Sequence, residues 1–351
     1  DTDTDTDTDT DTDTDTDTDT DPEPQTTAVV TTVSSDYSTG SFASVSLSDL
    51  SVTDEIFVTS GDPVVISDEG MIFQINRFTY DTVRVYEPGS WGEPVWEQDV
   101  GDLANPHDAE MCNGDLFVSL YGRDFIGVYD PANGTLKGTV DLSSFNDSDA
   151  TGPEASSLVE IDGKLYAGLN RLNRDDGWST EGGTVVEIDC ADQSVSNSWS
   201  VGGNTGIYAW PESDKLLVGA AAYGDDVSGL YVLDPSADTV ELLVDTGAEN
   251  ISALVAYGDD AVAITLASDF SSYKIHCIDL SSGDLNTVET TDSYLTGAYG
   301  NDAGKAWITS GSSWIEPSAP SGVFIYDVAT CTAETESPIE FSLFPFSLAF
   351  Y

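Results

Sequence analysis

The sequence predicts an all-β fold, a seven-bladed β-propeller, that follows an extended repeat of Asp-Thr pairs. The first 20 residues are ten consecutive Asp-Thr pairs, and the rest of the chain has almost no helical periodicity. An apolar strand that ends in an acidic residue and a turn then recurs six times, at intervals of 43 to 59 residues. A repeat of about 40–50 residues with four strands is typical of a propeller blade. The six acidic residues are Glu87, Asp130, Asp189, Asp234, Asp279 and Asp327.

The Asp-Thr repeat has no large apolar side chain and carries a charge at every second residue, so we expect it to be extended. Its regularly spaced hydroxyls suit O-glycosylation, because sugars on successive threonines would hold the backbone in one extended form. We therefore predict an Asp-Thr stalk over residues 1–27 and a propeller over residues 28–351. The predicted glycosylation sites are Thr2, Thr4, Thr6, Thr8, Thr10, Thr12, Thr14, Thr16, Thr18 and Thr20.

Two other interpretations of the repeat stay open. Without glycans, the repeat is a solvated, self-repelling tether. Alternatively, aspartates two residues apart on one face of a strand lie about 6.6–6.8 Å apart, and such a row of oxygen ligands can collect calcium or contact a mineral surface.

The composition excludes some partners. The chain has 64 Asp and Glu against 10 Lys and Arg, a net charge of −54, and most of the acidic residues lie outside the repeat. This charge repels nucleic acid and anionic lipid and suits a saline or calcium-rich exterior. No apolar run of about 18 residues is present, so we predict no transmembrane helix. We expect an extracellular or cell-surface protein.

Four cysteines allow three pairings if all are bridged: Cys112, Cys190, Cys277 and Cys331. Their spacing matches no zinc pattern. A bridge between Cys277 and Cys331 would join neighbouring repeats, and buried free thiols are the alternative.

The repeat predicts six complete blades, over residues 62–101, 104–145, 152–203, 204–248, 249–293 and 294–341. Gly or Asp turns followed by apolar runs, as at Gly114 and Gly163, are what tight hairpins require. We predict that residues 342–351 supply the inner strand of a seventh blade and residues 41–58 supply two outer strands, which leaves no open first edge. The aromatic residues of the final run are then predicted to be core: Phe344, Phe346, Phe350 and Tyr351.

The units resemble those of the YncE-like, YVTN-repeat seven-bladed propellers. The resemblance rests on Asn105-Pro106-His107-Asp108-Ala109-Glu110, Leu116-Phe117-Val118-Ser119 and Val128-Tyr129-Asp130-Pro131. It implies the fold over most of residues 41–351. The chain is also similar to secreted or lipid-anchored bacterial propellers in which an Asp-Thr linker precedes the ring. The resemblance implies no single activity, because one fold carries many functions.

Inner strands and the loops that lead into them line a propeller's channel, where propeller hydrolases and lactonases carry their chemistry. The candidate channel-face residues are His107, Asp108, Glu110, Arg123, Glu154, Arg171 and Arg174. His107 also fits a structural role, because the related repeats place a histidine there. Two histidines in the whole chain exclude a multi-histidine metal site, and no Gly-x-Ser-x-Gly motif is present. We therefore expect no enzyme.

Residues 146–154 present oxygen-bearing side chains at alternate positions before a glycine, as a short calcium loop does. The candidate calcium ligands are Asp147, Asp149 and Thr151. The segment lacks the full EF-hand spacing, so a solvated acidic loop is the alternative.

These observations favour an extracellular surface glycoprotein that self-associates, in a fibril, through its glycosylated stalk and displays the propeller as an interaction domain. A second hypothesis is a binding module for a surface glycan, a peptide or calcium on a passive tether. A third is a lactonase-like hydrolase.

Overall fold

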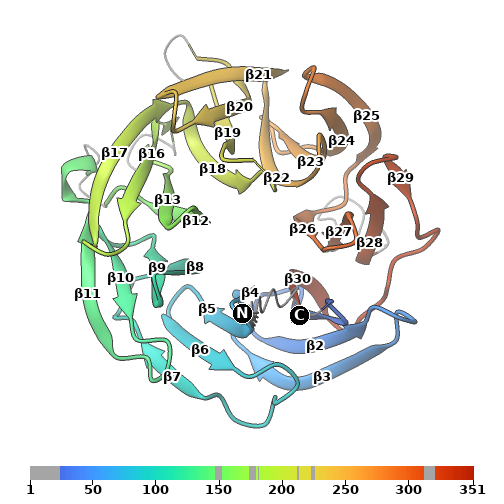
Figure 1. The fold of residues 1–351 in the computed structure, drawn as a ribbon. Helices are drawn as coiled ribbons and strands as arrows, with labels where there is room; N and C mark the ends of the chain where they lie inside the picture. Colours follow the sequence, from blue (N-terminus) through green and yellow to red (C-terminus); the bar gives the residue numbers. More distant parts are fainter. Residues whose placement is uncertain are drawn as a thin grey trace, which may run out of the picture.

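The computed structural model describes residues 24–146, 152–173, 179–180, 182–211, 213–222, 226–311 and 321–351. They form seven four-stranded antiparallel sheets arranged as blades around a central axis (Figure 1). The seven-bladed β-propeller is thereby confirmed. Most of the predicted stalk, residues 1–23, lies outside the described residues.

Blades 1 to 3 follow one another along the chain, each from its inner to its outer strand. Blade 1 contains β4 (Pro63–Asp68), β5 (Met71–Asn76), β6 (Thr82–Tyr86) and β7 (Trp96–Asp99). Blade 2 contains β8 (Pro106–Cys112), β9 (Asp115–Leu120), β10 (Phe125–Tyr129) and β11 (Leu136–Asp141), and the short 3₁₀ helix η1 (Ser143–Phe145) follows it. Blade 3 contains β12 (Ala155–Ile161), β13 (Lys164–Leu169), β16 (Gly183–Asp189) and β17 (Ser194–Val201), with a small hairpin of β14 (Leu172–Asn173) and β15 (Ser179–Thr180) between β13 and β16.

Blades 4 to 6 repeat the same order. Blade 4 contains β18 (Gly203–Ala209), β19 (Leu216–Ala221), β20 (Ser228–Asp234) and β21 (Thr239–Gly247). Blade 5 contains β22 (Glu249–Tyr257), β23 (Asp260–Ala267), β24 (Tyr273–Asp279) and β25 (Asp284–Thr291). Blade 6 contains β26 (Leu295–Gly300), β27 (Lys305–Ser310), β28 (Gly322–Asp327) and β29 (Thr332–Ala333).

Blade 7 closes the ring with strands from both ends of the chain. Its inner strand is β30 (Phe344–Phe350), which pairs with β1 (Thr27–Val33); β2 (Gly40–Ser46) and β3 (Val52–Thr59) follow outward. The six predicted complete blades and the shared seventh blade are thus confirmed. The prediction was wrong about how many strands the N-terminal part contributes to blade 7, because β1 adds a third strand to the two expected within residues 41–58. The ladder to β30 pairs Ala28 with Phe350.

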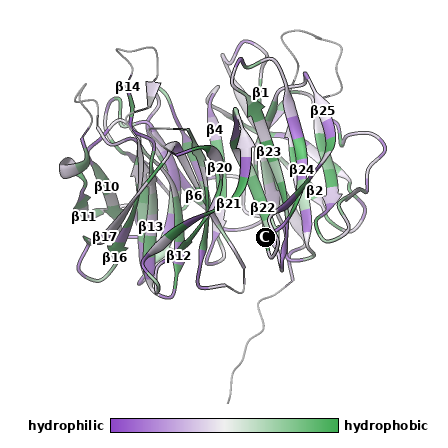
Figure 2. Cartoon of the chain, turned by 90° about the horizontal axis from the view of Figure 1, so that it is seen from above, coloured by the Kyte–Doolittle hydropathy of each residue, from purple (hydrophilic) through white to green (hydrophobic). Residues whose placement is uncertain are grey.

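The core is divided among the seven blade interfaces. Each of the hydrophobic clusters joins two neighbouring blades, as where Val29 and Phe42 of blade 7 meet Ile72 of blade 1. A blade is therefore covered on both faces, which is why strands such as β9 are buried at every residue instead of alternating. Figure 2 shows hydrophobic residues along the strands in this edge-on view.

Two faces of the ring carry different loops. In each blade, the loop between the second and third strands shares one face with the connection that leads into the inner strand, because neighbouring strands are antiparallel. We call this the upper face; β14 lies at the upper edge of Figure 2 and the C-terminus towards the lower edge. The hairpins between inner and second strands lie on the lower face. Those of blades 2 and 3 use Asn113-Gly114 and Asp162-Gly163, with φ positive at both residues, as the expected tight turns require.

Two disulfides join neighbouring blades. Cys112 at the end of β8 is bonded to Cys190 beyond β16, and Cys277 on β24 is bonded to Cys331 between β28 and β29. Of the alternatives that the sequence left open, the structure has the Cys277–Cys331 bridge, and no described cysteine is free. Within the described ranges, no helix is long and apolar enough to cross a membrane.

Candidate functional site

Two neighbouring cavities lie in the ring. The central channel has a volume of about 1070 Å³ and is lined by inner strands of all seven blades. A cleft of about 460 Å³ lies beside its upper mouth, between blades 7, 1 and 6. Both volumes fall in or near the range of small-molecule sites.

A β-bulge recurs near the start of the inner strands and aims one extra side chain at the channel. In β8 the register shifts between Pro106 and Asp108, so His107 is the extra residue, and in β30 the extra residue is Phe346. Equivalent shifts occur in β12, β22 and β26. A bulge redirects a side chain without breaking the sheet. The residues that reach the channel in this way are His107, Ser156, Ser252, Thr296 and Phe346.

Polar side chains of the inner strands connect several pairs of neighbouring blades. The carboxylate of Asp108 accepts a hydrogen bond from the backbone N–H of Leu158 in blade 3, at 2.8 Å, and another from the N–H of Ala109, at 2.9 Å. Asp68 accepts in the same way from Met111 at 2.6 Å. The channel carboxylates are therefore already occupied by backbone donors of the neighbouring blade.

Burial governs the charge of the channel acids. It raises the pKa of Asp108 to about 7, although the two backbone donors lower it. Burial, followed by the nearby carboxylates of Asp68 and Asp108, raises the pKa of Glu110 to about 9. Glu110 accepts a longer hydrogen bond, 3.3 Å, from the N–H of Glu160. This wall of the channel therefore holds fewer negative charges than its composition suggests.

His107 lies at the upper mouth of the channel and stacks on Tyr121, with ring centroids 4.5 Å apart and planes 15° apart. Burial, and then the charge of Arg77, hold the pKa of His107 well below its ordinary value. The imidazole is therefore neutral at physiological pH.

The other predicted channel-face residues lie away from the channel lining. Arg123 donates at 2.6 Å to the backbone carbonyl of Asp102, in the connection between blades 1 and 2. Glu154 is fully buried and accepts from the N–H of Leu172 at 2.8 Å, and Arg171 is half-buried in the same loop region. The structure thus brings His107, Asp108 and Glu110 together and leaves Arg123, Glu154 and Arg171 apart from them.

The predicted calcium ligands, Asp147, Asp149 and Thr151, and the candidate Arg174 lie outside the described residues. In the part of the chain that the structure describes, no group of three or more His, Cys, Asp or Glu side chains is arranged to hold a metal ion.

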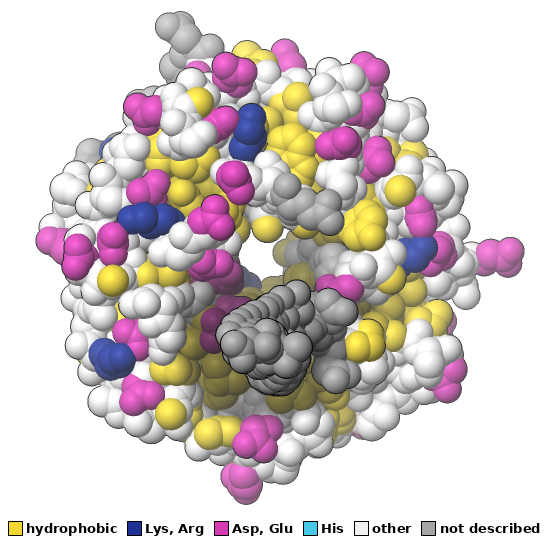
Figure 3. Space-filling view, in the orientation of Figure 1, with side chains coloured by type: hydrophobic (Ala, Val, Ile, Leu, Met, Phe, Trp, Pro, Cys, Tyr) yellow, Lys and Arg dark blue, Asp and Glu magenta, His cyan; other side chains and the backbone are white. Residues whose placement is uncertain are grey.

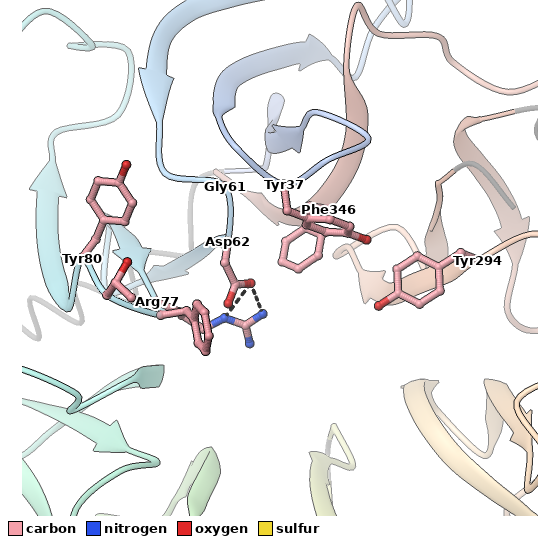
Figure 4. Close-up of a pocket in the computed structure, with 9 residues that line it drawn as sticks. Tyr37, Gly61, Asp62, Arg77, Tyr80, Tyr294 and Phe346 are labelled. Atoms are coloured by element: carbon pink, nitrogen blue, oxygen red, sulfur yellow. Dashed lines mark hydrogen bonds and ion pairs between the residues drawn. The ribbon is translucent and has the colours of Figure 1, made fainter. Parts of the chain in front are cut away.

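The cleft is built around one ion pair. Arg77, at the end of β5, donates from Nε at 3.1 Å and from Nη2 at 2.5 Å to the same oxygen, Oδ1, of Asp62. Figure 4 shows this pair between Tyr80 on one side and Tyr37, Phe346 and Tyr294 on the other. Gly61, Phe78 and Thr79 complete the lining.

One aromatic ring of the cleft contacts Arg77, and others are exposed to solvent. The Arg77 guanidinium carbon lies 5.6 Å from the centroid of Phe346, within the range of a cation–π contact. Tyr37 packs edge-on against Phe346 at 6.3 Å. The rings of Phe78 and Tyr80 are 71% and 58% exposed, an unusual degree for side chains of this size. Of the four aromatic residues predicted to be core, only Phe350 is buried, and Phe344 and Tyr351 are half-buried. Phe346 is half-buried because the bulge in β30 turns it towards the cleft.

The loop of residues 77–81 is fixed by the connection that leads into blade 2. The N–H of Phe78 donates to the side-chain oxygen of Asn105 at 3.3 Å. The buried carboxylate of Asp81 accepts from the N–H groups of Leu103 and Asn105, each at 2.8 Å. Three residues of this loop have positive φ, which is rare outside glycine and often marks functional sites: Phe78, Thr79 and Asp81.

The comparisons with known proteins support the fold and leave the activity open. No family model matches the chain, and no curated protein matches its sequence. Among solved structures, a protein from Lactobacillus plantarum is 10% identical, with a TM-score of 0.64 over 93% of this chain and 99% of that one. A proposed 6-phosphogluconolactonase from Bacteroides fragilis is 12% identical, with a TM-score of 0.64 over 94% and 100%. Apo AztD from Citrobacter koseri is 13% identical, with a TM-score of 0.54 over 93% and 98%. At such identities the likeness concerns the fold alone.

Sequence reasoning missed the cleft. It singled out Arg123, Arg171 and Arg174 as unusual cations in an acidic chain but not Arg77. A usable signal was the loop Arg77-Phe78-Thr79-Tyr80, where two aromatic residues and a cation replace the small turn residues expected between strands.

Proposed function

We propose that this protein is an extracellular interaction module that binds its ligand in the upper-face cleft around Asp62 and Arg77. The observation that carries the proposal is the combination of an ion pair with strongly exposed aromatic rings on a loop fixed by Asn105 and Asp81. A preformed cleft with a few polar groups among aromatic side chains is the usual form of a ligand site. Fixing the loop beforehand lowers the entropy cost of binding.

The lower face is where the N-terminal segment joins the propeller. The N–H groups of Thr26 and Thr27 donate to the carbonyl of Tyr351 at the end of β30, and Gln25 accepts from the N–H of Asp302 in a lower-face hairpin. The cleft lies on the opposite face. A propeller attached through its N-terminal segment would therefore present the cleft away from the attachment.

The Asp-Thr repeat supports the extracellular part of this proposal. We propose that it is an O-glycosylated stalk that self-associates, and that the chain belongs with the YncE-like, YVTN-repeat propellers. The two disulfides between blades suit an oxidising compartment. Intact mass measurement on protein from its native source tests the stalk: a regular mass excess on residues 1–20 is expected, and a mass equal to the bare chain would overturn this part.

A binding role is favoured over catalysis by the cleft's own groups. Its carboxylate and its guanidinium are paired with each other, so neither is placed as a free base or acid. The remaining lining residues are Gly61, Thr79 and five aromatic side chains.

The test is a binding screen by calorimetry with three probes: neutral oligosaccharides, aromatic peptides and calcium. Phe78→Ala should weaken binding of whichever probe binds. Phe270→Ala is the matched control, because Phe270 is an upper-face loop residue of blade 5, is 75% exposed, has positive φ and lines neither cavity. Equal binding by both variants would contradict the proposal.

A further inference from the structure

Resting on the proposed function, we infer that the ligand of the cleft is a neutral carbohydrate, held by adjacent hydroxyl groups on Asp62 and Arg77 and by stacking on the aromatic rings. Three features of the cleft carry this inference: the unused hydrogen-bonding capacity of the ion pair, the placement of the rings around it, and the electrostatics of the whole protein.

The ion pair has one free acceptor and one free donor. Both donated hydrogen bonds from Arg77 go to Oδ1 of Asp62, and within the described residues neither Oδ2 of Asp62 nor Nη1 of Arg77 has a hydrogen-bond partner. Their side chains are 31% and 20% exposed, so both groups can be reached from the cleft. A hydroxyl group both donates and accepts. Two adjacent hydroxyls of a sugar can therefore donate to Oδ2 and accept from Nη1 at once.

The rings are placed to contact the apolar face of a sugar. Figure 4 shows Tyr80 and Tyr37 on opposite sides of the ion pair, with Tyr294 further along the same side as Tyr37. Burial raises the pKa of both Tyr37 and Tyr294, so their phenols stay protonated and can donate. A pyranose combines apolar C–H faces with a rim of hydroxyls, and this cleft offers partners for both.

Charge argues against anionic ligands. The net charge of −54 repels anions, and Figure 3 shows acidic side chains spread over the ring with few Lys and Arg. The positive charge of Arg77 is neutralised by Asp62, so the cleft offers no net charge to attract an anion. The lysines are also paired with carboxylates, at Asp115, Asp189, Asp234, Glu249 and Asp327.

The experiment compares neutral and acidic sugars on the purified protein. Calorimetry with neutral hexose oligosaccharides, with uronic acid oligosaccharides and with an aromatic peptide is run at low and high NaCl. We expect only the neutral panel to contain a ligand, with an affinity that changes little with salt because screening acts only on charges.

Asp62→Asn distinguishes a role of the ion pair in binding from a merely structural role. It removes the anionic acceptor and leaves the charge of Arg77 unpaired, so affinity for the neutral sugar should fall by about tenfold or more. Affinity for the uronic acid sugar should rise in the same variant. Its melting temperature is measured alongside, and Tyr80→Ala, which leaves the ion pair intact, provides a second variant that should also lower neutral-sugar affinity.

The outcomes separate this inference from the proposed function. If the peptide or the uronic acid sugar binds the wild-type protein and Phe78→Ala weakens that binding, the cleft is the site and the carbohydrate inference is overturned. If a neutral sugar binds equally well to Phe78→Ala, Tyr80→Ala and Phe270→Ala, or if no probe binds, both proposals are overturned.

Discussion

The channel and the cleft share Arg77, Tyr294 and Phe346 in their linings but use their charged groups in different ways. Asp108 in the channel accepts one backbone N–H group across a blade boundary, and so does Asp68 at the end of β4. In the cleft, Asp62 and Arg77 pair with each other and keep one donor and one acceptor free within the described residues. These acids therefore connect neighbouring blades, whereas we propose that the cleft pair binds a ligand. Four sets of variants test this division, two of them by measuring stability and binding side by side.

Removing the Cys112–Cys190 bridge should have the largest effect on stability. It joins blades 2 and 3, the blades that Asp108 also connects. Replacing both cysteines by serine should lower the free energy of unfolding by about 2–4 kcal/mol, measured by denaturant titration. Ligand affinity should stay unchanged because the cleft lies on blades 7, 1 and 6. A loss of affinity in folded protein would show that the two regions are coupled.

Asp108→Ala should come next. It leaves the N–H of Leu158 without its acceptor inside the ring, which costs about 1–3 kcal/mol of unfolding free energy. Asp108→Asn keeps an acceptor oxygen and should cost less. Thermal melts of the two variants check the order, and equal stability of Asp108→Ala and wild type would mean that this contact does not hold the blades together.

Glu110→Gln should change how stability depends on pH. The pKa of Glu110 is raised to about 9 by burial, so the folded state favours the protonated form. The contribution of Glu110 to the stability of the folded state is complete below the ordinary pKa of a glutamate. This contribution is lost as the pH rises through about 9. Glu110→Gln should therefore be more stable than wild type by on the order of 1 kcal/mol or more at pH 9 and equal at pH 4.

Melting curves across this range test the prediction. Glu241→Gln, at an exposed position on β21, is the control and should show no such pH-dependent gain. A gain at acidic instead of alkaline pH would contradict the assigned cause.

Asn105→Ala should have the smallest effect. Its side chain accepts one hydrogen bond, from the N–H of Phe78, and so positions a residue of the cleft without touching the ligand. Losing it should reduce ligand affinity by about two- to fivefold, since a single hydrogen bond is worth about 0.5–1.5 kcal/mol. Calorimetry measures the affinity. A larger loss of stability than of affinity would mean that Asn105 stabilises the fold of the ring and does not position the cleft.

The fold could be predicted because a sequence pattern recurs once per blade. In blades 1 to 6 an acidic residue ends the third strand, as Asp234 does, or directly follows it, as Asp130 does, so the spacing of these residues marks the blades. The strand β1 escaped prediction because it lacks that turn signature and begins close to the low-complexity repeat. Its partner, β30, lies at the other end of the chain, so only three-dimensional pairing identifies it.

The site was less predictable for a physical reason. His107, Asp108 and Glu110 were found because they fall in one recognisable strand, but that pattern does not tell whether a carboxylate faces a ligand or a backbone N–H. The cleft brings together Asp62, Arg77, Tyr294 and Phe346 from three blades, and these residues are far apart in the sequence. Phe346 was predicted to be a core residue because no feature of its own segment predicts the bulge that turns it outward.

The most direct test of the central claim is a crystal structure of the propeller with a neutral oligosaccharide that binds it in solution. The account predicts the sugar in the upper-face cleft, with adjacent hydroxyls on Oδ2 of Asp62 and Nη1 of Arg77 and a ring face against Tyr80 or Phe78. A sugar bound instead within the channel, against His107 and Glu110, would contradict the assignment of binding to the cleft and of the channel acids to the ring.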